Sequence, residues 1–231
     1  MSKGSSSKTK RLVLAALFSA LAYTATLSTA WIKVSGFLTF DTKDAVITIA
    51  GLVLGPVYAL VISLLVSLIE IIFVPDTGFW GFLMNFLSTA AFACVCSLIY
   101  KYKKNIVSAA IGLVAAVFSM TAMMVVLNLF VTPIYTGMPM STIAAMIPTL
   151  FLPFNFTKAV LNAALVLMLY KPISRALKAT KMTVSAEKSH AISTKSKVLR
   201  YLIIYSVGAI LVAASVCVLI FVLHGEFTFF E

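Results

Sequence analysis

The stretch "DAVITIAGLVLGPVYALVISLLVSLIEIIFV", residues 44–74, decides how this chain folds. It is apolar over most of its length, but Gly55-Pro56 interrupts it near the middle. A bilayer core of about 30 Å is crossed by roughly 20 apolar residues of helix. The stretch can therefore form one long tilted helix, or two short helices joined at Gly55-Pro56. That choice fixes on which side of a membrane every later loop lies.

The composition places the chain in lipid. Its 231 residues are 61% hydrophobic and only 11% charged, with a mean hydropathy of +1.08. Ordinary soluble domains carry about 25% charged residues, so this much apolar surface cannot be hidden from water. The net charge of +11 could suit nucleic acid, but the basic residues form short clusters between apolar segments rather than one basic face. We expect an all-α integral membrane protein in the lipid bilayer, with no nucleic-acid partner.

Basic residues decide between one helix and two at 44–74. Other apolar segments long enough to span a bilayer are 12–31, 79–100, 106–130, 144–170 and 200–224. Most Lys and Arg residues fall in the N-terminal tail, at 101–104, or between 171 and 200. Basic loops stay on the cytoplasmic side, and all three clusters reach that side only if 44–74 is two helices.

The resulting domain organisation is a six-helix membrane domain with an addition at its C-terminal side. We expect the following segments: a disordered basic tail at 1–10, the membrane domain at 11–178, a basic linker at 179–199, a seventh transmembrane helix at 200–224 and an extracellular tail at 225–231. The N-terminus is then cytoplasmic, and the protein is a multi-pass component of the cell membrane.

The first of the two short helices predicts a lid. Residues 44–54 span only about 16 Å of helix, roughly half the bilayer. The preceding loop "FLTFDTKD", residues 37–44, must therefore dip inward and be covered by protein, because exposed loop backbone is not tolerated in hydrocarbon. We interpret it as a lid at the outer mouth, with Asp41, Lys43 and Asp44 anchoring its return into the helix.

Polar residues inside the apolar segments mark a candidate pocket. They are Glu70, Asn85, Asn128, Asn155, Lys158 and Asn162. An ionisable residue in a span costs at least ~2.5 kcal/mol and indicates function. Asn155 and Lys158 share one helix face after Pro148 and Pro153, and we expect them to meet Asn128 below the lid.

Amide side chains offer both donors and acceptors, and aromatic side chains offer flat apolar walls. With Phe37, Phe40 and Tyr135 as walls, such a pocket suits a planar, neutral, hydrogen-bonding ligand. The alternative is structural: Lys158 pairs with Glu70, and the asparagines serve as hydrogen bonds between helices.

The first helix carries small residues that permit close approach of another helix. Ala16 and Ala20 are four apart, as are Ala15 and Ser19. This face can dock a partner or pack within the chain, and the pattern alone leaves both open.

Catalytic and metal-binding patterns are missing from the sequence. It has no carboxylate pair, Ser/His/Asp set or HExxH motif, and its three cysteines, Cys94, Cys96 and Cys217, lie in apolar segments as packing residues. We expect no enzyme activity, no metal and no cofactor. The chain also lacks a G-x-x-x-x-G-K-[ST] phosphate loop, so an ATPase that drives transport would be another chain.

Six stretches of the chain are, in order, "AALFSALAY", "KVSGFLTFDTKD", "GLVLGPVYAL", "GFWGFLMNFLSTAAF", "NLFVTPIYTGM" and "LPFNFTKAVLNAAL". Together they resemble the S component of energy-coupling factor (ECF) vitamin transporters, most closely the riboflavin-binding type. The resemblance covers about residues 10–178. It implies capture of riboflavin from outside, with the loop after the first helix closing over the ligand. It also implies a membrane T component and two ATP-binding subunits as partners.

The resemblance and the buried polar residues together predict a riboflavin-binding set and a docking set. The riboflavin-binding residues are Leu38, Thr39, Phe40, Asn85, Asn128, Tyr135, Asn155 and Lys158. The docking residues are Ala15, Ala16 and Ala20. The extra helix at 200–224 departs from the family pattern.

Three other functions remain open at this point. One is an S component for another planar vitamin or a flavin nucleotide. Another is a stand-alone ion-coupled carrier with Glu70 as its coupling group. The last is a membrane enzyme, which would need a carboxylate or histidine cluster that the sequence does not show.

Overall fold

A computed structural model describes the backbone of residues 3–34, 38–73, 78–179, 194–223 and 226–227. The described part of the chain is almost entirely helical, as the composition predicts. Its helices are α1 (Lys3–Thr29), α2 (Lys43–Leu54), α3 (Pro56–Phe73), α4 (Gly78–Tyr102), α5 (Ile106–Thr136), α6 (Met140–Met146), the π-helix η2 (Ile147–Phe151), α7 (Leu152–Ala179) and α8 (Thr194–Phe221).

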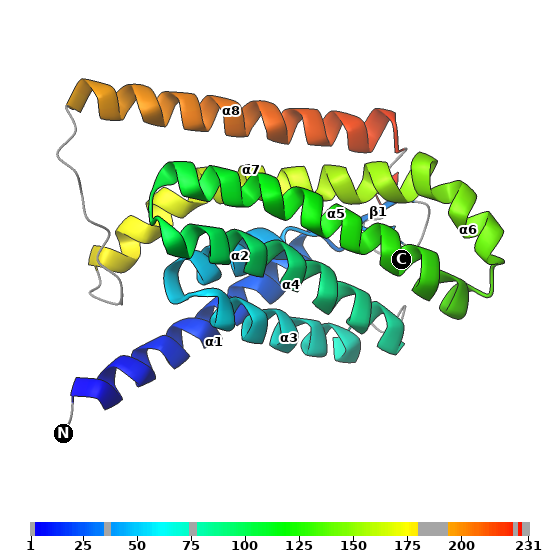
Figure 1. Cartoon of the computed structure of the whole chain (residues 1–231), viewed down its shortest axis with the longest axis horizontal. Coiled ribbons are helices and arrows are strands. Elements are labelled where there is room, and N and C mark those ends of the chain that lie inside the picture. Colours follow the sequence, from blue (N-terminus) through cyan, green and yellow to red (C-terminus); the bar gives the residue numbers. More distant parts are fainter. Residues whose placement is uncertain (1–2, 35–37, 74–77, 180–193, 224–225, 228–231) are drawn as a thin grey trace.

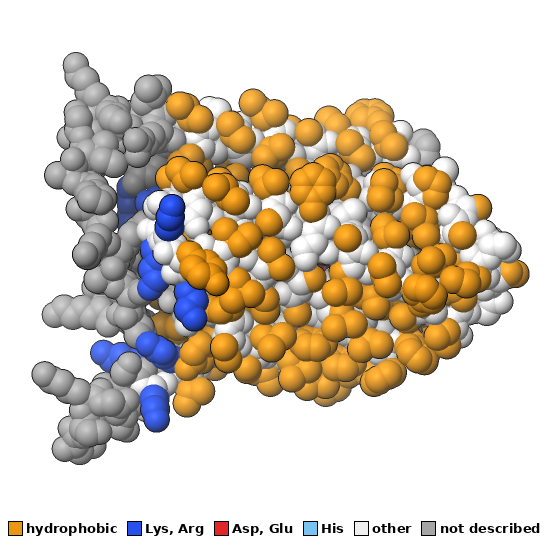
Figure 2. Space-filling view, in the orientation of Figure 1, with side chains coloured by type: hydrophobic (Ala, Val, Ile, Leu, Met, Phe, Trp, Pro, Cys, Tyr) orange, Lys and Arg blue, Asp and Glu red, His pale blue; other side chains and the backbone are white. Residues whose placement is uncertain are grey.

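The long helices lie alongside one another, and α8 runs along α7 at the edge of the bundle (Figure 1). Lys and Arg side chains gather at one end of the molecule, while apolar side chains cover its sides (Figure 2). We call this end, which holds Arg11, Lys101 and Lys104, the basic end. A small antiparallel sheet lies at the opposite end, which we call the loop end. Its strands are β1 (Ile32–Val34), β2 (Leu38–Thr39) and β3 (Glu226–Phe227), in the order β2-β1-β3.

Residues 44–74 form two helices, as predicted. Helix α2 ends at Leu54 and α3 starts at Pro56, separated by Gly55 with a φ of +107°. Residues other than glycine rarely adopt a positive φ, and proline favours the first position of a helix. The sequence Gly55-Pro56 therefore ends one helix and starts the next. The short helix α2 is buried along most of its length by α1, α3, α4 and α7.

Length and apolarity qualify five segments of the described chain as membrane spans. These are Lys8–Thr29, Gly78–Tyr102, Ile106–Thr136, Met140–Leu177 and Leu202–Phe221. Helix α3 is a shorter apolar helix, and α2 is too short to cross a bilayer alone.

The seventh helix is present as α8, and it packs closely on α7. A Cβ atom added at Gly208 would lie 2.5 Å from the Cγ of Met168, so the glycine permits this approach. At the loop end, Leu219 and Leu223 lie in an apolar cluster with Phe151 and Phe154 of the neighbouring segments. The added helix is therefore packed on the membrane domain from Gly208 to the loop end.

The N-terminal segment differs from its predicted form. Residues 3–10 are the start of α1 and not a disordered tail. Adding residues to an existing helix costs far less than nucleating one, so the apolar span extends into the polar segment. Of the predicted tail at 225–231 only the strand β3 is described, and most of the linker at 179–199 lies outside the described residues.

We predict that Gly51→Ala destabilises the bundle. An added Cβ would lie 2.1 Å from Ser97 Oγ and 2.9 Å from Ala59 Cβ, so α2, α3 and α4 must move apart. Overpacking of this kind costs about 1–3 kcal/mol. Thermal unfolding in detergent should show a lower midpoint for the variant, and Gly51→Ala combined with Ser97→Ala should recover part of the loss. Equal midpoints for wild type and Gly51→Ala would contradict this packing.

Candidate functional site

A cavity of about 430 Å³ lies below the β1–β2 hairpin at the loop end. Its volume falls in the range of about 300–1,000 Å³ that is usual for small-molecule sites. Side chains from α1, α3, α4, α5, α7 and the hairpin contribute to its wall. The polar lining residues are Thr26, Lys33, Thr39, Asp41, Lys43, Glu70, Asn85, Ser88, Asn128, Tyr135, Asn155 and Lys158.

Two buried asparagines face this cavity with their amides already oriented. The Asn128 Nδ2 donates to the carbonyl oxygen of Met124 at 2.7 Å, and its Oδ1 accepts from Thr132 at 3.0 Å. The Asn155 Nδ2 donates to the carbonyl oxygen of Phe151 at 2.7 Å. An amide nitrogen has two N–H donors, and each of these local bonds uses one. The second donor of each amide can serve a ligand.

Asn155 follows an irregular turn that the prolines produce. Residues 147–151 form the π-helix η2, with Pro148 in its first turn, before α7 begins. Proline removes a backbone donor, and π-turns are frequent at functional sites. The Asn155 side chain bonds the carbonyl of Phe151, at the end of η2, and is thereby held toward the cavity.

Paired charges tie the hairpin to the helices. Lys158 on α7 lies 2.7 Å from Asp41 Oδ2 in the loop that follows β2. Lys43 at the start of α2 contacts both oxygens of Glu70 on α3, at 2.6 and 2.7 Å, and lies 3.7 Å from Asp41. All four side chains are nearly fully buried. Removing one member of a buried pair leaves an unpaired charge, which is strongly destabilising.

The Lys158–Glu70 pair considered from the sequence is wrong, because Lys158 pairs with Asp41 and Glu70 pairs with Lys43. Burial alone would raise the pKa of the Asp41 carboxyl. The Lys158 and Lys43 ammonium groups beside it outweigh burial and hold that pKa below its ordinary value. Asp41 therefore stays ionised at neutral pH and keeps its contacts with both lysines.

Asn162 holds the start of α2. Its Oδ1 accepts from the backbone N–H of Ala45 at 2.9 Å, and its Nδ2 donates to the carbonyl oxygen of Asp41 at 3.0 Å. The first N–H groups of a helix have no partner within the helix, so this side chain satisfies one of them. Asp44 is fixed as well, by a 2.6 Å hydrogen bond from Thr89 on α4. The structure confirms that Asp41, Lys43 and Asp44 anchor the loop's return into α2.

The structure brings all but one of the predicted ligand residues to a single cavity. Those that line it are Leu38, Thr39, Asn85, Asn128, Tyr135, Asn155 and Lys158. Phe40 does not line it in this structure, and its contact with a ligand stays a prediction. Its ring packs edge-on against Phe154, with centroids 5.8 Å apart, and it is Phe154 that faces the cavity. The aromatic wall Phe37 lies outside the described residues.

Sequence reasoning missed the apolar part of the lining. Phe154, Met84, Met120 and Met124 line the cavity in addition to the predicted residues. The methionines lie within apolar helices, where nothing in the sequence separates a cavity wall from ordinary core. Phe154 stands beside Asn155, so its position next to a predicted ligand residue was the one available signal.

The small residues predicted for docking on α1 differ in their exposure. Ala16 and Ala20 are exposed on α1, whereas Ala15 and Ser19 are buried and joined by a 2.9 Å hydrogen bond from Ser19 Oγ to the Ala15 carbonyl. Consecutive helical residues point about 100° apart, so Ala15 and Ala16 cannot share a face. The open small-residue face consists of Ala16 and Ala20.

The fold and this site define a membrane substrate-binding protein, and comparison with known proteins gives its family. The family described as "ECF transporter, substrate-specific component" matches residues 10–170, so the chain belongs to it. The chain is 29% identical over 177 residues to the Riboflavin transporter RibU of Staphylococcus aureus (strain TCH60), covering 73% of this chain and 93% of that protein.

A solved structure, that of the S component of a bacterial ECF transporter, matches with a TM-score of 0.63 and 28% identity. The match covers 74% of this chain and 99% of that one. The family match ends at residue 170, before α8 begins at Thr194.

We predict that Glu70→Gln lowers the stability of the protein by about 3 kcal/mol, because the buried Lys43 then loses its closest charged partner and keeps only Asp41, 3.7 Å away. Thermal or chemical unfolding in detergent measures the effect. Replacing both partners, as Lys43→Met with Glu70→Gln, should be less harmful than Glu70→Gln alone. If the double variant loses as much stability as Lys43→Met and Glu70→Gln lose in sum, the two side chains are not coupled, which would contradict this pairing.

Proposed function

We propose that the chain is the riboflavin-capturing S subunit of an ATP-driven ECF importer. The observation that carries this proposal is the convergence of the predicted residues from four separate segments on one cavity under an anchored hairpin. The similarity to a protein named as a riboflavin transporter supports the same ligand.

The chemistry of the cavity fits a flavin ring. The ring is flat and carries carbonyl and N–H groups along one edge. Asn128 and Asn155 can provide donors and acceptors to that edge, and Lys158 keeps further N–H donors beyond its contact with Asp41. Leu38 and Phe154 supply apolar surface to the ring faces. The cavity thus offers hydrogen bonds in one direction and flat walls in the others.

The orientation follows from the charge distribution. Basic loops stay in the cytoplasm, so the basic end of the molecule lies there and the hairpin faces outside. Riboflavin would then enter from outside, and the strands β1 and β2 with the described residues 40–42 after them would close behind it as a lid. The strand β3 pairs with β1, so the C-terminal segment lies at the edge of this lid.

Energy must come from other subunits. The sequence has no ATP-binding phosphate loop, and Glu70 is engaged by Lys43, Thr26 and Asn85, so we assign it no role in ion coupling. A membrane T component with two ATP-binding subunits would supply the driving force. The exposed Ala16 and Ala20 on α1 would form the docking face for that component.

We predict that Asn155→Ala and Lys158→Ala each weaken riboflavin binding at least about tenfold, equivalent to 1.4 kcal/mol. Each substitution removes hydrogen-bond donors from the cavity. Titration of the purified protein, followed by quenching of flavin fluorescence, measures the affinity. Lys171→Ala, on the same helix but at the basic end, is the matched control and should bind normally. Unchanged affinity in both site variants would rule out this pocket.

We predict that Ala16→Trp abolishes riboflavin uptake by cells while the purified protein still binds riboflavin. A large ring on this face blocks close approach of the T component but is distant from the cavity lining. Val114→Trp, exposed on α5, is the control for a bulky lipid-facing substitution and should transport normally. Normal uptake by Ala16→Trp would exclude this face from docking.

A further inference from the structure

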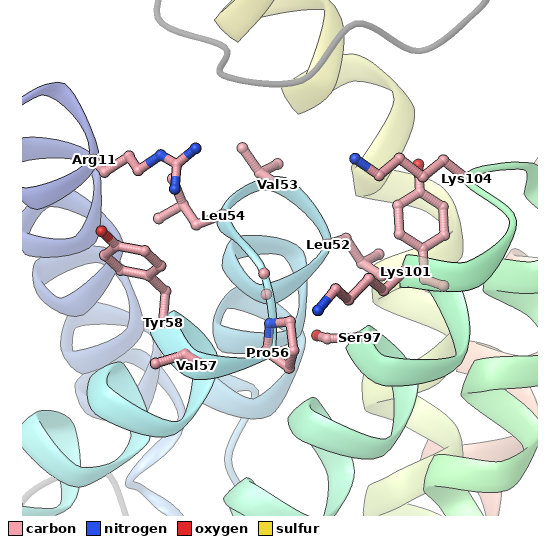
Figure 3. A pocket seen from close by; sticks show the side chains of 13 residues that line it. Arg11, Leu52, Val53, Leu54, Pro56, Val57, Tyr58, Ser97, Lys101 and Lys104 are labelled. Atoms are coloured by element: carbon pink, nitrogen blue, oxygen red, sulfur yellow. The ribbon is translucent and has the colours of Figure 1, made fainter. Parts of the chain in front are cut away.

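A second cavity, of about 400 Å³, lies at the basic end of the molecule. It is formed by the start of α1, the α2–α3 turn, the end of α4 and the loop after it (Figure 3). Its lining residues are Arg11, Gly51, Leu52, Val53, Leu54, Gly55, Pro56, Val57, Tyr58, Ser97, Tyr100, Lys101 and Lys104. None of them lines the loop-end cavity, so this is a separate site.

Three cations surround this cavity, and the described residues that line it include no acid. Figure 3 shows Arg11 entering from α1 on one side, and Lys101 and Lys104 extending toward the α2–α3 turn from the other. The acidic side chains that the structure describes, Asp41, Asp44 and Glu70, all belong to the network at the loop end. The described lining of the cavity is therefore positively charged, with Arg11 and Lys101 on opposite sides, and this favours an anion.

Arg11 adds an independent indication of a missing anion. Its Nε atom is buried and has no hydrogen-bond partner within the described part of the chain. A buried donor without a partner costs about 1–3 kcal/mol, more when the group is charged. Guanidinium groups bind phosphate and carboxylate oxygens through paired N–H bonds. An oxyanion in the cavity would satisfy this donor.

The rim of the cavity meets the lipid-facing surface. Val57 lines the cavity and is 70% exposed, and Leu60 and Val61 continue the same exposed apolar surface along α3. A ligand with a phosphate head and apolar tails could place its head among the cations and its tails against α3. Basic pockets between transmembrane helices on the cytoplasmic side recognise anionic lipid head groups in this way.

We propose that this cavity binds the phosphate of an anionic phospholipid in the leaflet at the basic end. Arg11 and Lys101 hold the phosphate oxygens from opposite sides, with Lys104 adding charge, and the acyl chains lie on the exposed apolar surface of α3. The inference does not depend on which ligand occupies the loop-end cavity. It gives the protein a lipid contact at the turn that separates α2 from α3.

The experiment compares two double variants that lose the same charge. Arg11→Gln with Lys101→Gln removes two lining cations, whereas Lys10→Gln with Lys103→Gln removes two exposed cations that neighbour them in sequence but do not line the cavity. Lipid-depleted protein in detergent is incubated with phosphatidylglycerol or with zwitterionic phosphatidylcholine, and bound lipid is counted by native mass spectrometry.

We expect wild type and the Lys10/Lys103 variant to retain phosphatidylglycerol in preference to phosphatidylcholine. The Arg11/Lys101 variant should bind phosphatidylglycerol at least about tenfold more weakly than wild type. Equal binding by all three proteins, or no preference for the anionic lipid, would overturn the proposal. So would displacement of the lipid by millimolar inorganic phosphate, which would identify a free phosphate as the ligand.

The same variants separate lipid binding from folding and from subunit contact. Riboflavin binding, measured in parallel, should be unchanged in both double variants because the cavities are distinct. If the Arg11/Lys101 variant does not fold, Lys101→Gln against Lys103→Gln repeats the comparison with one charge. Normal phosphatidylglycerol binding by the Arg11/Lys101 variant, together with loss of assembly with partner subunits, would assign the cavity to a protein and contradict a lipid.

Discussion

The pairing of Asp41 with Lys158, and of Lys43 with Glu70, is the interaction on which the rest of the site depends. Helix α2 is too short to cross the bilayer, so its polar start lies within the protein and needs partners there. Lys43 at the start of α2 pairs with Glu70 on α3, and Lys158 on α7 pairs with Asp41 in the preceding loop. Without these pairs, the buried carboxylates of the loop and of α3 would each cost several kcal/mol, and the loop could not lie over the cavity.

This constraint explains why the loop before α2 is rich in charge. Its acids and lysine hold the backbone in place, and the Asn162 side chain accepts a hydrogen bond from the Ala45 N–H in the first turn of α2 and donates one to the Asp41 carbonyl oxygen. Lys158 takes part in both tasks, because it pairs with Asp41 and also lines the cavity. Asn128 is oriented by a bond within α5 and Asn155 by a bond to the end of η2, which leaves donors for a ligand. These two asparagines can therefore serve recognition without holding the loop.

Much of the fold could be predicted from the sequence because lipid imposes strong rules. The division of residues 44–74 into two helices could be predicted from helix length, the Gly55-Pro56 break and the basic clusters. Polar residues in apolar spans are conspicuous, so most of the cavity's polar lining was found. The partner of Lys158 could not be predicted, because two acids, Asp41 and Glu70, were available and only packing decides between them. Phe154 was missed for the same reason: Phe40 and Phe154 are both aromatic and adjacent to the site, and only packing decides that the ring of Phe154 lines the cavity while Phe40 packs against it.

If the loop-end cavity binds riboflavin, the purified wild-type protein should show it in its absorption spectrum. We expect flavin absorption bands in the protein as isolated, or after incubation with riboflavin and removal of the excess, at about one flavin per chain. Protein that stays colourless after that incubation does not bind riboflavin in this cavity.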